Sequence, residues 1–95
     1  MIGKYVIVRG DCSGVFAGTL AEQNGREVTL RNARRLWRWA GATDTVQLAM
    51  EGVKQPSGCN FTMECEAIKL LDAIEVIPTT AEAEMCIKAV KVWKV

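Results

Sequence analysis

The segment NARRLWRWAGAT, residues 32–43, concentrates side chains that could hold a phosphorylated ligand. Guanidinium groups bind phosphate through a planar set of donors, often in a bidentate manner. Indole rings stack on nucleobases, with about 1–3 kcal/mol per base. The two chemistries together predict a site for a ligand that carries both a phosphate and a base. The candidate ligand-binding residues are Arg34, Arg35, Trp37, Arg38 and Trp39, extended by the hydroxyl groups of Thr43 and Thr45.

The same segment also has a purely structural interpretation. Trp37 would then anchor a core or an interface, and the arginines would face solvent or pair with the acids between residues 64 and 84. Two tryptophans are difficult to bury together in so small a domain, and an indole is costly to leave in water. At least one of them is therefore expected to contact a ligand, a partner chain or a helix. Asp44 stands where it would cap a helix and occupy N–H groups that an anion would otherwise bind.

Catalytic and metal-binding patterns are missing from the sequence. The chain has no histidine, no G-x-S-x-G motif and no glycine-rich phosphate loop ending in Lys-Ser/Thr. Its four cysteines are Cys12, Cys59, Cys65 and Cys86. They form no C-x-x-C pair, so we expect reduced thiols packed as small apolar groups, without zinc and without disulfides. We expect a protein that is not an enzyme and that needs no metal and no cofactor.

Length and composition limit the classes of protein to which this chain could belong. Ninety-five residues correspond to a single domain, residues 1–95, and a hydrophobic content of 49% is that of a folded chain. No apolar run approaches the roughly 20 residues of a membrane span, so no membrane contact is expected. The N-terminus lacks the pattern of a signal peptide. The formal net charge is only +1, which makes tight nucleic-acid binding an unfavourable hypothesis.

Three segments in the first half of the chain have strand character. They are residues 4–9, 15–23 and 26–39, with Asn24–Gly25 predicted as a type I′ turn before the third. A helix with the arginines on one face competes with the third strand. The strand is favoured, because a hairpin precedes it and tryptophan suits strands. It would place residues 35, 37 and 39 on one face and residues 34, 36 and 38 on the other.

The second half of the chain mixes helix and strand signals. Residues 41–53 predict a helix capped by Asp44, with Thr43 as a competing cap and with Val46, Ala49 and Met50 on its inner face. Residues 79–90 predict a second helix, capped by Thr79. Residues 61–65 and 73–77 favour strands, with a helix over 66–73 as the alternative, and the terminal VKVWKV predicts an extended tail or an edge strand. The expected fold is α+β, a small antiparallel meander or half-open barrel of about five strands with two short helices.

The stretches NARRLWRWAGA, VQLAMEGV and AVKVWKV give the chain a resemblance to a known group. It resembles a family of small uncharacterised tailed-phage and prophage proteins that carry an ARRLWRW-x-GA motif. The similarity extends from KYVIVR to VWK, which is nearly the whole chain. The resemblance implies a phage origin and a place in the host cytoplasm, and it transfers no catalytic or binding residue.

Three functions are compatible with these features. The first is a non-enzymatic protein that sequesters a small nucleotide-type signal of host defence, a cyclic oligonucleotide or an ADP-ribose derivative, by analogy with compact phage proteins that do so. The second is an interaction module that docks on a host or phage protein, because tryptophan and arginine dominate interface hot spots. The third is a weak single-stranded nucleic-acid binder. A homo-oligomer, most simply a dimer, is expected from the high apolar content and the terminal edge strand.

Overall fold

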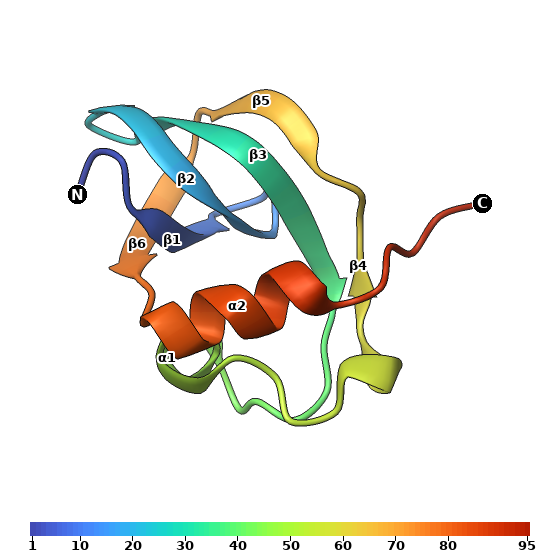
Figure 1. Cartoon of the computed structure of the whole chain (residues 1–95). Coiled ribbons are helices and arrows are strands. Elements are labelled where there is room, and N and C mark those ends of the chain that lie inside the picture. The colour runs from blue at the N-terminus through green and yellow to red at the C-terminus, as the bar shows by residue number, and fades with distance from the viewer.

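A six-stranded antiparallel sheet and two helices make up the computed structural model, which describes residues 1–95 (Figure 1). The elements are β1 Tyr5–Gly10, β2 Val15–Asn24, β3 Glu27–Arg38, α1 Thr45–Glu51, a 3-10 turn Pro56–Gly58, β4 Asn60–Phe61, β5 Cys65–Leu70, β6 Ala73–Pro78 and α2 Ala81–Ala89. The strand order is β4–β3–β2–β1–β6, and β5 pairs with β3 on the edge that β4 also uses. The predicted α+β fold class is confirmed, with six strands. Neither helix has the length and apolar character that crossing a bilayer would require.

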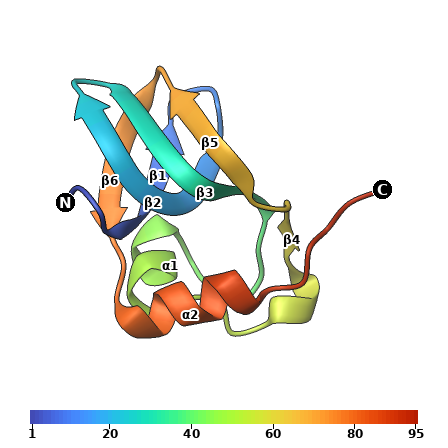
Figure 2. The ribbon, with the colours of Figure 1, turned by 45° about the horizontal axis from the view of Figure 1, so that its top comes forward.

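The sheet curls so far that each of its faces covers a separate hydrophobic core. Figure 2 shows the strands as an open barrel, with both helices packed on one side of it. In β1, Tyr5 and Ile7 belong to the core beneath the helices, whereas Val6 and Val8 belong to the core inside the barrel. All four side chains are buried. The uninterrupted apolar run of β1 is thus explained, because side chains alternate between two covered faces.

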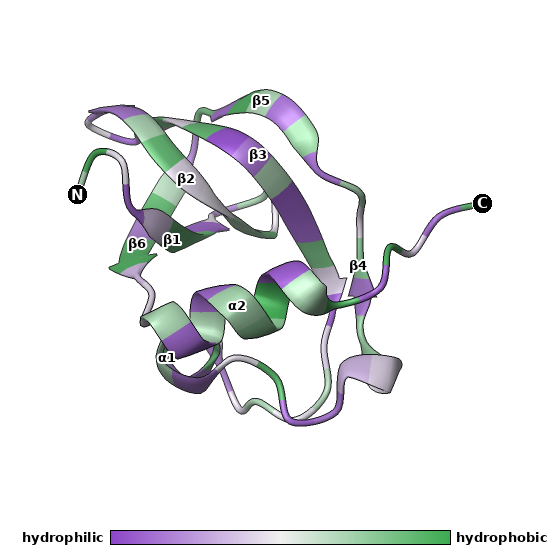
Figure 3. Cartoon of the chain, viewed as in Figure 1, coloured by the Kyte–Doolittle hydropathy of each residue, from purple (hydrophilic) through white to green (hydrophobic).

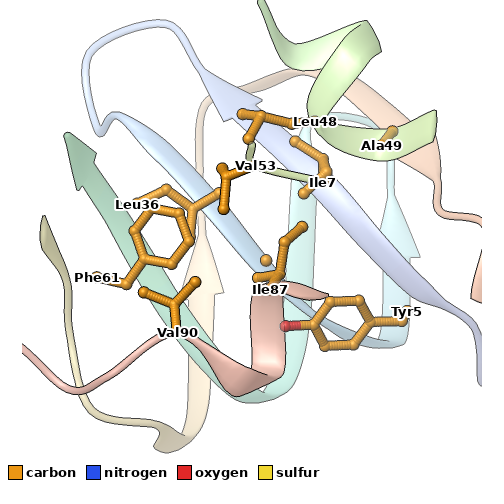
Figure 4. Close-up of a cluster of buried hydrophobic side chains, with 10 residues drawn as sticks. Tyr5, Ile7, Leu36, Leu48, Ala49, Val53, Phe61, Ile87 and Val90 are labelled. Carbon is orange, nitrogen blue, oxygen red and sulfur yellow. The ribbon is translucent and has the colours of Figure 1, made fainter. Parts of the chain in front are cut away.

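The core beneath the helices joins residues from the whole chain. Figure 4 shows Leu48 of α1 and Ile87 of α2 gathered with Leu36 of β3 and Phe61 of β4. These four side chains are 2% exposed or less. Each fully buried side chain of this size contributes roughly 1.5–3 kcal/mol through the hydrophobic effect. This core holds the end of β3 against the helices and so fixes the position of the Arg/Trp segment.

Strand β3 changes its facing at a bulge in its middle. Asn32 has a positive φ of 50°, and the pairing with β2 shifts between Ala17 and Thr19. At that point Gly18 lies so close to β3 that an added Cβ would stand 2.9 Å from the Cβ of Ala33. An extra residue in one strand reverses the side-chain alternation beyond it. Leu30 and Arg34 are four residues apart and would share a face in a regular strand. Because of the bulge, Leu30 points into the barrel and Arg34 points toward the helices.

The strand interpretation of the Arg/Trp segment is confirmed as far as Arg38, and the competing helix is wrong. Hydrophilic and hydrophobic bands alternate along β3, with a broad hydrophilic band in its second half (Figure 3). The helix alternative over 66–73 is wrong as well, because this stretch forms β5, a turn and the start of β6. The two-residue turn before β3 is Gly25–Arg26, since Asn24 pairs with Glu27. Only Gly25 has a positive φ there, so the type I′ prediction is wrong.

Both helices form where predicted, but two details differ. Asp44 caps α1 by accepting a hydrogen bond from the N–H of Gln47. The inner face of α1 is formed by Thr45, Leu48 and Ala49, whereas the predicted Val46 and Met50 are exposed. The two stripes are adjacent on the helix and equally periodic, and packing against α2 and β1 selects the stripe with leucine.

The cap of α2 is Thr80 instead of Thr79. The hydroxyl of Thr80 accepts from the N–H of Ala83 at 3.0 Å. Thr79 is used elsewhere, because its N–H and its hydroxyl both donate to the carbonyl of Tyr5 in β1. Thr79 thus ties the end of β6 to β1, and the helix begins one residue later than predicted.

Candidate functional site

A hollow of about 470 Å³ lies between the β1–β2 turn and the C-terminal end of β3. Its walls include Arg35, Trp37 and Trp39 of the predicted segment and Ser13 and Val15 of the facing turn. Ligand sites typically enclose about 300–1,000 Å³ and combine aromatic walls with a few polar groups. The volume of this hollow lies in that range, and its lining combines aromatic and polar side chains in a depression that is open to solvent.

A second hollow of about 360 Å³ shares Val15 and Trp39 with the first. The predicted Thr43 and Thr45 are in its lining. The rest of its lining is Arg9, Asp44 and Glu75. We call the two neighbouring hollows together the Trp39 groove, because Trp39 lines both of them. Five of the seven predicted site residues line this groove. Asp44, which was predicted as a helix cap, also lines it, and the tertiary structure adds Arg9 and Glu75, which no sequence pattern indicated.

Arg35 is the cation of the first hollow. Its side chain is exposed, and its guanidinium carbon lies 4.8 Å from the ring centroid of Phe16. None of the ion pairs in the structure includes Arg35. Its backbone N–H donates to the hydroxyl of Thr62 at 2.8 Å, which fixes the strand at this residue. A cation without a carboxylate partner is suited to bind a phosphate. Arg35 also borders a smaller hollow of about 230 Å³ over the barrel interior.

Arg34 does not line the groove with the other predicted residues. Its side chain is 2% exposed. The guanidinium donates to the carbonyls of Thr62 at 2.7 Å, Ile87 at 2.8 Å and Phe61 at 3.4 Å. Burial lowers the pKa of Arg34. Its donors are used to join β3, β4 and the C-terminal end of α2, where a positive charge also complements the helix dipole. Arg38 is exposed but lines neither hollow.

The two predicted tryptophans have different environments. Trp39 is half-buried against the core beneath the helices, and its indole N–H donates to the carbonyl of Ala42 at 3.2 Å. Trp37 is 63% exposed and stacks on Trp93, with ring centroids 5.3 Å apart. Trp93 belongs to the C-terminal tail, whose Val92 forms a bridge with Phe61 of β4. The tail was expected to be extended, but nothing in the sequence linked Trp93 to Trp37.

The turn that faces Arg35 is held in place by one carboxylate. Asp72, in the β5–β6 turn, accepts hydrogen bonds from the N–H of Cys12 at 2.7 Å and from the N–H of Ser13 at 3.0 Å. It also accepts from the Ser13 hydroxyl at 2.7 Å. These bonds favour the charged carboxylate and lower the pKa of Asp72, the bond from Cys12 most strongly. One wall of the first hollow therefore depends on an ionised Asp72.

Hydrogen bonds also fix the polar end of the groove. The Thr45 hydroxyl donates to Oε1 of Glu75, and Nε of Arg9 approaches the same oxygen at 3.4 Å. The backbone N–H and the hydroxyl of Thr43 both donate to Oε1 of Gln47, at 2.8 and 3.0 Å. The carboxylate of Asp44 accepts a hydrogen bond from the N–H of Gln47, so this donor at the start of α1 is already used. The short helix therefore offers no anion site. The hydroxyls of Thr43 and Thr45 are both used in hydrogen bonds within the protein.

The cysteines are unpaired, but they are not all packed as apolar groups. Cys12 and Cys65 are exposed, and Cys59 and Cys86 are partly buried. Cys12 lines the first hollow beside Ser13. No three side chains of histidine, cysteine, aspartate or glutamate are grouped to hold a metal ion.

The fold and the groove define a small α+β domain with an open, strongly curled antiparallel sheet. The model of a family described as "Domain of unknown function (DUF6948)" matches residues 3–87. The chain therefore belongs to this family. No curated protein and no solved structure matches the chain. The matched residues include the whole Trp39 groove and exclude Trp93.

Proposed function

We propose that this protein is a non-enzymatic binding protein for a small nucleotide-type ligand and that the Trp39 groove is the site. The observation that supports it is the placement of an unpaired guanidinium, Arg35, in one hollow with the indoles of Trp37 and Trp39. The guanidinium would bind a phosphate and an indole would stack on the base. The groove offers no histidine and no metal cluster to support a reaction, and the proposal needs none.

The biological setting belongs to the same proposal. The resemblance to small tailed-phage and prophage proteins supports a phage origin and a place in the host cytoplasm. In that setting, a protein that binds a nucleotide without cleaving it would sequester a signal of host defence. The supporting physical feature is a groove whose polar groups are fixed by hydrogen bonds, since a preformed site loses little entropy on binding.

Titration calorimetry with nucleotides tests this function. The panel contains ADP-ribose, a cyclic dinucleotide and a cyclic trinucleotide, with the unaltered chain and two variants. Arg35→Ala removes a charge-assisted hydrogen bond of about 1.5–3 kcal/mol, which corresponds to about ten- to a hundredfold in affinity. Arg38→Ala is the matched control, because it removes an exposed arginine that does not line the groove. Absence of nucleotide binding, or equal losses in the two variants, would contradict the proposal.

A second candidate function has its own observation. Trp37 and Trp93 form a stacked pair with 63% and 45% of their surface exposed. Exposed tryptophans of this kind are frequent anchors of protein interfaces. Under this alternative the protein docks on a host or phage protein through the stacked pair. Trp93→Ala distinguishes the two functions, because Trp93 does not line the groove and its loss should leave nucleotide affinity within about twofold.

A further inference from the structure

The charges along the Trp39 groove are distributed unevenly between its two ends. Arg35 is the only charged residue in the lining of the first hollow. The second hollow contains two carboxylates, Asp44 and Glu75, and one guanidinium, Arg9, whose Nε is directed to Glu75. The groove is therefore cationic at the β3 end and net anionic at the α1 end. A ligand that fills both hollows must match both ends.

The carboxylates of the anionic end retain free acceptor oxygens. Both protein donors to Glu75, from Thr45 and Arg9, reach Oε1, and no hydrogen bond reaches Oε2. The cap bond of Asp44 uses Oδ1, and no hydrogen bond reaches Oδ2. Ionised carboxylates accept hydrogen bonds and donate none. This end therefore favours ligand groups that donate, and it repels a phosphate.

We infer that the groove takes a ligand with a phosphate at one end and a sugar with free hydroxyls at the other, as in ADP-ribose. This inference rests on the proposed function and specifies its ligand class. The diphosphate would lie against Arg35, the base would stack on an indole of the first hollow, and the terminal ribose would reach Asp44 and Glu75 past Trp39. Recognition of ribose hydroxyls by an acidic side chain is a common solution in nucleotide-binding proteins.

A cyclic oligonucleotide fits this distribution of charge poorly. Its phosphates are spread around a closed ring, and it has no terminal sugar. A ring that contacts Arg35 with one phosphate would bring another toward the carboxylates of the second hollow. Like charges brought together in this way discriminate against a competing ligand as effectively as new contacts favour the correct one.

The test is titration calorimetry with ADP-ribose, ADP and cyclic di-AMP. ADP is the matched ligand, because it has the same base and diphosphate but lacks the terminal ribose. We expect ADP-ribose to bind the unaltered chain at least about tenfold more tightly than either of the others. Glu75→Gln should lower the affinity for ADP-ribose about tenfold and change the affinity for ADP less than about twofold. It should raise the affinity for cyclic di-AMP. Asp44→Asn is a second variant that keeps a good helix cap, and thermal melts show whether each variant is folded.

The outcomes separate this inference from the proposed function. If cyclic di-AMP binds the unaltered chain as tightly as ADP-ribose, or if both acidic-residue variants weaken ADP and ADP-ribose equally, the inference is wrong. The proposed function then still stands, provided that Arg35→Ala weakens the binding about tenfold or more and Arg38→Ala does not. If none of the three nucleotides binds, or if Arg35→Ala has no effect, the proposed function itself fails.

Discussion

Single residues of one sequence segment have very different roles in this protein. Arg34 and Arg35 are neighbours in the chain, yet one is buried and bonded to three carbonyls while the other is exposed in a hollow. Trp37 and Trp39 differ in the same way, although less sharply. Alternation along β3 separates the two arginines, because successive side chains of a strand point to opposite faces. A mutation in this segment must therefore be interpreted residue by residue.

Arg34→Met should destabilise the fold strongly. The substitution removes the Arg34 donors from the carbonyls of Thr62, Ile87 and Phe61. Ile87 and Phe61 each keep a backbone N–H donor, so the largest loss is expected at the carbonyl of Thr62, and an unsatisfied group costs about 1–3 kcal/mol. We expect a loss of roughly 3 kcal/mol in the free energy of unfolding, measured by urea denaturation. Arg38→Met, at an exposed position, should change it by less than about 0.5 kcal/mol. Similar losses in the two variants would contradict the structural role of Arg34.

The two tryptophans should separate stability from binding. Trp39→Ala removes a half-buried ring and the hydrogen bond to Ala42, so it should cost about 2–3 kcal/mol of stability. Trp37→Ala removes an exposed ring that stacks on Trp93 and should cost no more than about 1 kcal/mol. Thermal melts of both variants give the comparison. A Trp37 variant that loses the fold would show that this ring is structural.

At the scale of elements, the β1–β2 turn depends on a side chain from a distant turn. Asp72 lies about sixty residues away in the chain and accepts three hydrogen bonds from Cys12 and Ser13. The turn carries Ser13 and Val15 into the groove. A carboxylate that accepts several hydrogen bonds holds the donor groups in place, and it does so most strongly when it is ionised. The shape of the first hollow is thus linked to the ionisation of one carboxyl group.

Asp72→Asn should make the protein less stable at neutral pH and less sensitive to acid. The pKa of Asp72 is lowered in the fold, so the charged form contributes stability above its unfolded pKa of about 4. That contribution disappears as the pH falls through the lower folded pKa. Urea denaturation should show a clear difference between variant and unaltered chain at neutral pH, and the difference should shrink in strong acid. A difference that is constant with pH would contradict the clamp.

At the scale of the whole molecule, apolar surface remains after the chain has folded. Trp37 and Trp93 lie exposed side by side, and Val92 beside them is 43% exposed. The edge strands β5 and β6 are each paired on one side only. Exposed strand edges and aromatic patches are the surfaces through which small domains associate. These features are the physical basis for expecting a homo-oligomer.

We predict a dimer in solution, with the stacked tryptophans in or near the interface. Light scattering at micromolar concentration should give at least twice the monomer mass. Trp93→Ser should lower the apparent mass, because the substitution removes apolar area from the patch. Met85→Ser is the control, since Met85 is 73% exposed on α2 and is not part of the stacked pair. A monomer mass for the unaltered chain would contradict this prediction.

The sequence by itself predicted the first three strands, the two helices and the segment that lines part of the groove. Period-two alternation and turn residues predicted the first three strands, and Asp44 predicted the start of α1. These are local signals, because they depend on neighbours within a few residues. The same alternation predicted that Arg35, Trp37 and Trp39 share one strand face. All three line one hollow, but Trp39 lies beyond the end of β3 and packs against the core beneath the helices.

The tertiary structure decided which of these residues are available to a ligand. Arg34 does not reach the groove, because the bulge at Asn32 and the hydrogen bond to the distant carbonyl of Ile87 direct its side chain beneath the helices. Glu75 enters the groove only because β6 pairs with β1, which places it opposite Arg9. Trp93 reaches Trp37 only because the tail runs along β4. Such contacts join residues far apart in the chain, and no local pattern encodes them, because long-range packing selects among equally periodic alternatives.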